Sequence, residues 1–206
     1  MDLEEKRKVF EVKFNREIIP NFKEIFGNNN PLHLEIGSGR GEFIIEKSNR
    51  YPDINFIAVD VKEKRIKTII RKLDPLINKN IRVIRMFIDS ESIKFFSKEK
   101  FEKIYLMFPD PWPKRKHHRR RIINDDFITV LYNLLKRDGM LEIVTDHKEY
   151  ALWINDHFKR RKDFKSFYQD GYTRNAPEDH IITFFEEKMR NLGYEPYYFK
   201  FIKKGE

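Results

Sequence analysis

The sequence predicts an α/β fold in which helices cover both faces of a mostly parallel, twisted sheet. Three observations lead to this prediction: short runs of β-branched and aromatic residues alternate with amphipathic helical segments, acidic residues end five of the predicted strands, and no repeat or long linker divides the 206 residues. Strand–helix alternation of this kind is typical of a parallel sheet. A chain of this length forms one domain or at most two small ones.

The first 27 residues are mixed in charge and are predicted to form a helical N-terminal extension, which ends at the turn-forming residues from Gly27 to Pro31. Residues 28–206 then form the α/β domain. Its first half is predicted to contain a strand at 32–36, a helix around 41–49, a strand at 55–59 and a helix that buries Ile66, Ile69, Ile70 and Leu73.

The second half continues the alternation of strands and helices. The predicted elements are a strand near 82–88, a strand at 103–108, a helix near 125–137, a strand at 140–145 with a helix after it, a loop at 170–180, a helix through Gly193 and a strand at 197–203. The helix near 125–137 is predicted to end at Gly139 and to bury Phe127, Val130, Leu131, Leu134 and Leu135.

Composition excludes several classes of protein. Hydrophobic residues make up 40% of the chain and aromatic residues 15%, which is enough for a packed core despite a charged fraction of 36%. The absence of cysteine excludes disulfides, thiolate-bound zinc and a catalytic thiol. No run approaches the roughly 20 apolar residues of a membrane span, and the start is too highly charged for a signal peptide. We therefore expect a cytoplasmic protein with no membrane partner, and the sequence is compatible with either a monomer or a homodimer.

Positive charge is concentrated in the segment 114–121. The chain has 42 Lys and Arg against 33 Asp and Glu, a net charge of +9, and six of the positive residues lie in this segment, which holds no acid. A focused basic patch favours a nucleic-acid partner, whose phosphates it neutralises. A solvated basic loop is the alternative. His117 and His118 lie in the same segment, but no acid or cysteine nearby completes a ligand set, so no metal site is predicted.

The acidic residues at the predicted strand ends are Glu35, Asp60, Asp89, Asp110 and Asp146. The carboxyl ends of the strands in an open α/β sheet form the edge where ligands bind. An acid at a strand end can also cap the next helix, so each one alone carries little information. Five acids at one edge indicate a ligand site.

A glycine-rich turn at residues 37–41 (GSGRG) follows the first strand and begins a helix. Its glycines allow a tight turn and let the backbone approach a ligand closely. Glu42 stands where the dinucleotide-binding pattern G-x-G-x-x-G needs its last glycine. Glu35 favours a cationic ligand over a pyrophosphate, and Asp60 is placed to accept hydrogen bonds from ribose hydroxyls. These features favour S-adenosylmethionine over a nicotinamide cofactor, with a purely structural turn as the alternative.

Residues 108–114 (FPDPWPK) lead from a strand into the basic segment. Prolines fix φ and restrict the residues before them, so Asp110 and Trp112 are expected in a stiff, extended loop. A carboxylate beside an indole suits a purine, because the ring can stack while the acid accepts from guanine N1–H and the 2-amino group. A proline-rich bend with a packed tryptophan is the alternative.

Two segments resemble the signature motifs of a known family. Residues 34–43 (LEIGSGRGEF) and 108–122 (FPDPWPKRKHHRRRI) are similar to those of bacterial tRNA (guanine-N7)-methyltransferases of the TrmB type, and residues 145–147 (TDH) and 183–188 (TFFEEK) resemble two further family segments. The likeness runs from about residue 30 to the C-terminus. The second segment is long and specific, whereas the first occurs in many methyltransferases.

The resemblance implies a Rossmann-like class I S-adenosylmethionine-dependent methyltransferase that forms 7-methylguanosine at position 46 in the variable loop of tRNA. It implies a cofactor-binding role for Glu35, Gly37, Gly39, Gly41, Asp60, Asp89 and Asp110, although the pattern around Asp89 follows the family only loosely. It implies contacts with tRNA or guanine by Lys114, Arg115, Arg119, Arg120, Asp146, Thr183, Phe184, Phe185 and Glu186.

Guanine N7 has a free lone pair, so its methylation needs positioning and desolvation more than a strong base. Asp110 is the candidate catalytic residue, which would orient the guanine and stabilise the positive charge that the ring gains. A methyltransferase acting on an exocyclic amine is the second interpretation, but such enzymes usually place Asn before Pro-Pro. A nicotinamide-dependent oxidoreductase and a non-catalytic RNA-binding domain are the alternatives from other classes.

Overall fold

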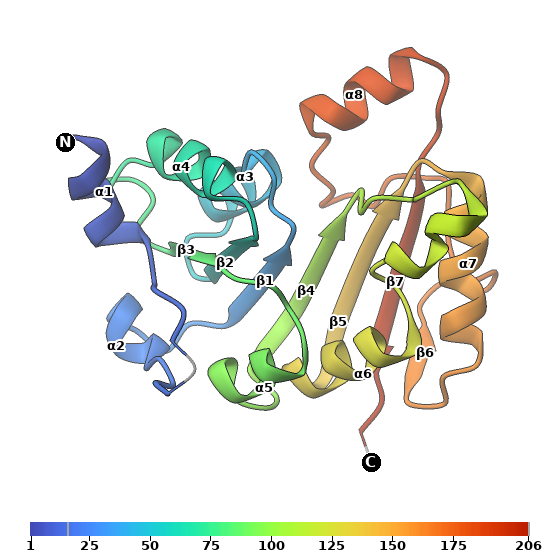
Figure 1. The fold of residues 1–206 in the computed structure, drawn as a ribbon, viewed down its shortest axis with the longest axis horizontal. Helices are drawn as coiled ribbons and strands as arrows, with labels where there is room; N and C mark the ends of the chain where they lie inside the picture. The colour runs from blue at the N-terminus through green and yellow to red at the C-terminus, as the bar shows by residue number, and fades with distance from the viewer. Residues whose placement is uncertain (16, 206) are drawn as a thin grey trace.

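Seven strands form one twisted sheet in the part of the chain that the computed structural model describes, residues 1–15 and 17–205 (Figure 1). They are β1 (Leu32–Ile36), β2 (Asn55–Asp60), β3 (Ile81–Arg85), β4 (Phe101–Met107), β5 (Leu135–Thr145), β6 (Phe164–Ser166) and β7 (Tyr197–Lys203). The strand order is β3-β2-β1-β4-β5-β7-β6, with β1 to β5 parallel and β7 antiparallel to both of its neighbours. The prediction of a mostly parallel sheet is confirmed.

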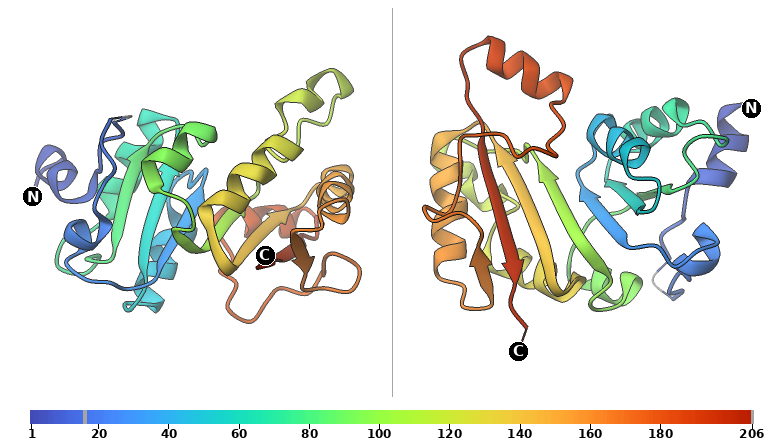
Figure 2. Two further views of the ribbon diagram at one scale, coloured as in Figure 1. Left: turned by 90° about the horizontal axis from the view of Figure 1, so that it is seen from below. Right: turned by 180° about the vertical axis from the view of Figure 1, so that it is seen from behind.

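Helices lie on both faces of this sheet (Figure 2). They are α1 (Leu3–Phe10), α2 (Phe22–Phe26), α3 (Glu42–Arg50), α4 (Glu63–Lys72), α5 (Ser90–Phe96), α6 (Asp125–Leu134), α7 (Lys148–Lys159) and α8 (Phe184–Asn191). Because side chains alternate between the faces of a strand, Ile57 and Val59 of β2 enter the core that α5, α6 and α7 share. Phe56 and Ala58 enter a second core with α1, α3 and α4.

The N-terminal segment is not the continuous helix that the sequence predicts. α1 ends at Phe10, and the chain then runs extended beside β3, where the N–H of Val12 donates to the carbonyl of Val83 at 3.0 Å. Phe10 is fully buried in the core that α4 lines, and Lys6 donates to two carbonyls at the end of α4. The extended stretch depends on β3, which is distant in the sequence, so local charge patterning could not reveal it.

The predicted helix near 125–137 ends early, at Leu134, and β5 begins at Leu135. Gly139 therefore lies inside a strand and does not end the helix. A Cβ atom at Gly139 would lie 2.8 Å from the carbonyl oxygen of Lys136, so glycine permits a close backbone approach where β5 pairs irregularly with β4.

The predicted strand near 82–88 is also shorter, because β3 ends at Arg85. The chain then enters α5, a helix that the sequence analysis missed. Asp89 and Ser92 form a capping box at its start: the Ser92 hydroxyl accepts from the N–H of Asp89 at 3.0 Å, and the Asp89 carboxylate accepts from the N–H of Ser92 at 3.3 Å. The D-x-x-S spacing is the sequence signal that could have predicted α5.

Candidate active site

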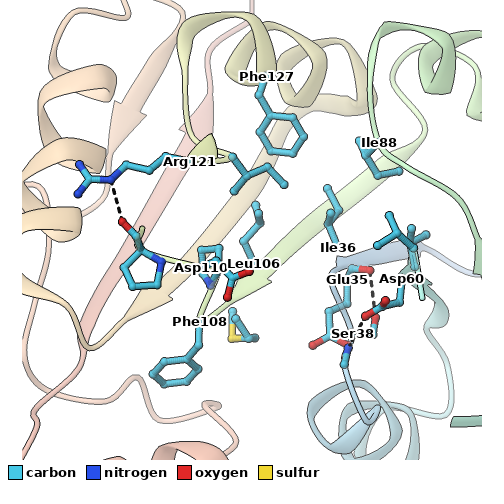
Figure 3. A pocket seen from close by; sticks show the side chains of 18 of the residues that line it. Glu35, Ile36, Ser38, Asp60, Ile88, Leu106, Phe108, Asp110, Arg121 and Phe127 are labelled. Carbon is cyan, nitrogen blue, oxygen red and sulfur yellow. Dashed lines mark hydrogen bonds between the residues drawn. The ribbon is translucent and has the colours of Figure 1, made fainter. Parts of the chain in front are cut away.

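A cleft of about 1720 Å³ opens at the carboxyl ends of β1, β2 and β4. From β1 the chain continues to β2, which lies on one side of β1 in the sheet, and from β4 it continues to β5, which lies on the opposite side. The strand order therefore reverses between β1 and β4. Ligands of open α/β sheets bind at such a switch point. Most of the predicted site residues line this cleft (Figure 3). They are Glu35, Gly37, Gly39, Asp60, Asp89, Asp110, Arg119, Arg120, Asp146, Thr183, Phe184 and Phe185.

The glycine turn forms one wall of the cleft. Gly37, Gly39 and Gly41 have φ values of 78°, 55° and 75°, in the left-handed region that favours glycine. The N–H groups of Gly37 and Ser38 both donate to the carbonyl of Val59, at 2.8 and 2.9 Å, which fixes the turn on β2. Gly41, for which the sequence predicts a cofactor-binding role, is outside the cleft lining formed by the described residues. A Cβ atom there would lie 2.9 Å from the side chain of Ile69, so glycine lets α3 pack closely on α4.

Glu35 is a buried carboxylate at the end of β1. Glu35 is 2% exposed, and its Oε2 atom has no hydrogen-bond partner among the described residues. Burial raises the pKa of Glu35 to about 8, and the nearby Asp60 carboxylate adds to the rise. A buried acceptor without a donor is unfavourable, so this oxygen suits a ligand that brings an N–H or O–H group into the cleft.

Asp60 and Asp89 each bind backbone N–H groups. The Asp60 carboxylate accepts from the N–H of Gly39 at 3.1 Å and from that of Lys62 at 2.8 Å, and each oxygen keeps the capacity for a second donor. Asp89 accepts from the N–H of Glu91 at 2.9 Å as the N-cap of α5. Capping therefore accounts for the position of Asp89, whereas Glu35 caps no helix.

The loop after β4 brings Asp110 to the opposite wall of the cleft, with its carboxylate exposed. The prediction of an extended loop is wrong at its ends: Phe108 and Trp112, each before a proline, have φ values of 52° and 42°. Trp112 lines the cleft, and it also contacts the basic segment: the guanidinium of Arg120 lies 4.9 Å from its ring centre, and His117 contacts its edge. The indole thus anchors the basic segment.

The basic segment forms a 3-10 helix at Arg115–Arg120. Lys114, Arg115, Arg119 and Arg120 are exposed; Arg119 and Arg120 line the cleft, whereas Lys114 and Arg115 are outside its lining. Arg121 differs from them: it is 3% exposed, and its Nε donates to the carbonyl of Pro111 at 2.8 Å. From the sequence, Arg121 is indistinguishable from the other arginines predicted to bind phosphate, because the burial of one arginine inside a basic run has no local signal.

α8 stands above the carboxyl ends of β4 and β5 and forms the third wall (Figures 1 and 2). Phe185 contacts Phe108 edge to face, with ring centres 5.1 Å apart. The start of α8 is held by Thr183, whose hydroxyl accepts from the N–H of Glu186, and by Glu42, whose carboxylate accepts from the N–H of Phe184 at 3.1 Å. Glu42 thus links the helix of the glycine turn to α8, a contact that the sequence did not indicate.

Glu186, for which the sequence predicts a contact with tRNA or guanine, is a buried residue of α8. It is 0% exposed and is outside the cleft lining of the described chain. Its carboxylate lies 2.6 Å from Nε2 of His180, and it accepts from Arg190 at 2.9 Å and from the hydroxyl of Tyr198 at 2.6 Å. Burial alone would raise the pKa of Glu186, but the hydrogen bonds from His180 and Tyr198 hold it below its ordinary value. Glu186 therefore fastens α8 to the sheet.

This strand order, with a glycine turn after β1 and a ligand cleft at the carboxyl edge, defines a Rossmann-like class I S-adenosylmethionine-dependent methyltransferase. A family model described as "Putative methyltransferase" matches residues 29–199. The tRNA (guanine-N(7)-)-methyltransferase of Bacillus cytotoxicus is 36% identical over 184 residues, which cover 86% of this chain and 81% of that protein. That of Brevibacillus brevis is 33% identical over 178 residues, covering 86% and 83%. The chain belongs to the tRNA (guanine-N(7)-)-methyltransferase family.

Solved structures with the same fold include two other methyltransferases. The antibiotic-resistance methyltransferase Kmr has a TM-score of 0.65 at 11% identity, covering 95% of both chains. The 16S rRNA methyltransferase KamB has a TM-score of 0.65 at 9% identity, covering 91% of this chain and 95% of that one. At these identities the likeness shows the fold alone.

S-adenosylmethionine is the cofactor of the chain, and the residues of the cleft fit it. The orphaned oxygen of Glu35 suits its ammonium group, and the free acceptor capacity of Asp60 suits its ribose hydroxyls. Among residues 1–15 and 17–205, no group of three or more His, Cys, Asp or Glu side chains is arranged to hold a metal ion. No helix in those residues is both long and apolar enough to cross a bilayer.

Proposed function

We propose that the chain transfers the methyl group of S-adenosylmethionine to N7 of a guanosine in tRNA, at position 46 of the variable loop. The family supports tRNA as the substrate, since the relatives from Bacillus cytotoxicus and Brevibacillus brevis are named for that reaction. The observation that carries the proposal is that a single cleft brings together Glu35, the glycine turn and Asp110. One wall is suited to the cofactor and the opposite wall to the guanine.

Bound S-adenosylmethionine supplies an electrophilic methyl group. The chain has to hold the guanine with N7 toward this group, exclude water and stabilise the positive charge that the ring gains. Asp110 is suited to the first and third tasks, because a carboxylate accepts from guanine N1–H and the 2-amino group and its negative charge favours a cationic ring. Phe108 and Phe185 are apolar neighbours that keep this part of the cleft dry.

The arginines of the 3-10 helix supply the contacts with RNA in this proposal. Arg119 and Arg120 are exposed, line the cleft and lie on the same segment as Asp110. Phosphates that bind them would bring the nucleotide chain to the mouth of the cleft. Lys114 and Arg115, just outside it, extend the positive surface.

The direct test is incubation of the protein with labelled S-adenosylmethionine and an unmodified tRNA transcript, followed by chemical cleavage at 7-methylguanosine. We expect cleavage at position 46, and none in a transcript with adenosine at that position. Label in an exocyclic methylamine would instead support the second interpretation. S-adenosylhomocysteine should raise Tm, whereas a non-catalytic RNA-binding domain would give neither label nor a thermal shift.

Replacing Arg119 and Arg120 together by Gln should raise the Kd for tRNA roughly tenfold at moderate salt. Each lost phosphate contact should also reduce the slope of log Kd against log salt by about 1. Filter binding over a series of salt concentrations measures both quantities. The control replaces Arg137 and Lys204 by Gln, two exposed residues at the amino-terminal edge of the parallel strands, and equal effects in both variants would contradict a specific role for the 3-10 helix.

Cofactor affinity should depend on pH through Glu35. Its pKa in the free protein is about 8 against an ordinary value of 4.5, so Glu35 is mostly protonated at pH 7. A cationic ligand group favours the ionised form, so binding should release a proton below pH 8, and affinity should rise as pH increases toward about 8, by up to about tenfold per unit. Calorimetry in buffers of different ionisation enthalpy measures the released proton.

Glu35→Gln provides the control for that measurement, because the amide cannot titrate. Its cofactor affinity should be lower and independent of pH between 6 and 8. Equal proton release by the wild type and the variant would assign the titration to another group.

We further propose a division of these 206 residues into a domain and an extension. Residues 28–206 form the methyltransferase domain and residues 1–27 an N-terminal extension docked on it. A tRNA substrate supports a cytoplasmic location.

A further inference from the structure

Arg121 is the one arginine of the basic segment 114–121 that faces inward. It is 3% exposed, and its guanidinium lies over the rings of Tyr150 and Trp153, at 5.3 and 4.9 Å from the ring centres. Figure 3 shows this group directed away from Glu35 and Asp60. Arg121 is among the residues that line the cleft, but only 3% of it is exposed, and its Nε donates to a carbonyl of the chain.

The two rings that hold Arg121 are themselves fixed. Nε1 of Trp153 donates to the carbonyl of Ile123 at 2.7 Å, and the N–H of Ile123 donates to the hydroxyl of Tyr150 at 3.4 Å. Both rings belong to α7, which packs on the sheet through Tyr150, Ala151 and Ile154. The guanidinium of Arg121 is therefore held in place by side chains that are themselves fixed in the core.

The loop that Arg121 contacts cannot hold itself in place by its own donors. Pro109, Pro111 and Pro113 have no N–H group, so over this stretch the backbone offers mainly carbonyls for anchoring. At the same time Phe108 and Trp112 are in the left-handed region, which is unfavourable for such residues and persists only where the surroundings hold it. Loops of this kind need external donors.

Arg121 supplies such a donor one residue after Asp110, through the 2.8 Å bond from Nε to the Pro111 carbonyl. At the β4 end, the N–H of Phe108 donates to the carbonyl of Val144 at 2.8 Å. The two bonds bracket Asp110 and set where its carboxylate enters the cleft.

We propose that Arg121 is a positioning residue that fixes the Asp110 carboxylate for methyl transfer and does not bind RNA phosphate. This inference rests on the function proposed for Asp110. It separates Arg121 from Arg119 and Arg120, although the sequence places all three in one basic run. A displacement of about 1 Å at a reacting group can lower a rate by roughly a hundredfold.

The experiment compares Arg121→Lys with the wild type and with Arg137→Lys, an exposed control. Lysine keeps the charge but cannot stack its head group between two rings while donating in a fixed plane. We expect the single-turnover rate at saturating tRNA and cofactor to fall at least tenfold. The Kd for tRNA, its salt dependence and the thermal shift with S-adenosylhomocysteine should stay within about twofold of the wild type.

A double-mutant cycle with Asp110→Asn tests whether Arg121 acts through Asp110. In the Asp110→Asn background, Arg121→Lys should lower the residual rate by less than twofold. Should Arg121→Lys not fold, Trp153→Leu removes one side of the stack with Arg121 intact, and the same loss of rate without loss of tRNA affinity is expected.

A reduced salt dependence with an unchanged single-turnover rate would make Arg121 a phosphate ligand and overturn the inference, as would equal losses in both backgrounds. Normal formation of 7-methylguanosine by both the wild type and Arg121→Lys would overturn the inference about Arg121 and leave the proposed function intact. Failure of the wild type to form 7-methylguanosine would overturn the proposed function.

Discussion

Asp110→Asn should lower kcat by about a hundredfold or more while leaving the Kd for tRNA within about twofold. The variant keeps the size of the side chain and one acceptor oxygen, so the guanine can still enter the cleft. It loses the negative charge that stabilises the ring as N7 becomes methylated, and removing one preorganised group of this kind typically costs 10²–10³ in kcat. Single-turnover assays at saturating substrate, with tRNA binding measured separately, give the two quantities.

Asp138→Asn is the matched control for Asp110→Asn. Asp138 is exposed at the opposite edge of the sheet, its φ of 59° is one that Asn also adopts readily, and its removal should change neither rate nor affinity. A near-normal rate in Asp110→Asn would contradict electrostatic stabilisation by Asp110. A loss confined to tRNA affinity would make Asp110 a binding residue only.

The parts of the fold that the sequence predicted are those with a strong local pattern. β1 and β2 are short runs of buried residues with turn formers on either side, and the ends of both agree with the prediction to within one residue. The face of α4 with Ile66, Ile69 and Ile70 is buried as its spacing predicts. The acids at strand ends gather at one cleft because parallel strands end at the same edge, which is a consequence of topology and not of any one side chain.

The features that the sequence did not predict depend on contacts between distant segments. The extended stretch at Val12 exists because β3 offers it a partner, and Arg121 is buried because α7 provides two rings beside it. Glu186 lies in a motif that resembles a substrate-binding segment, yet its partners arrive from a loop, from one turn further along α8 and from β7. Spacing indicates only the contact of Glu186 with Arg190, four residues further along the helix; neither composition nor spacing carries a signal for the other contacts.

Glu186→Gln should loosen α8 and raise the KM for tRNA about tenfold, with a smaller change in the rate at saturation. The amide cannot accept charge-assisted hydrogen bonds from Arg190 and His180 together, and breaking a buried ionic network by removing one partner typically costs 3–5 kcal/mol. Because the network joins α8 to β7 through Tyr198, this loss should fall mainly on the attachment of α8.

Hydrogen exchange distinguishes this local loss from general destabilisation. In Glu186→Gln, amides of α8 should exchange faster by the factor that corresponds to the lost free energy, about tenfold per 1.4 kcal/mol, while those of β1, β2 and β4 change little. Glu187→Gln, an exposed neighbour on the same helix, should leave both exchange and KM unchanged. A raised KM without faster exchange in α8 would mean that Glu186 contacts the RNA directly after a rearrangement of the helix. Faster exchange with an unchanged KM would mean that the position of α8 does not affect tRNA binding. It would also argue against contacts of Phe184 and Phe185 with tRNA or guanine.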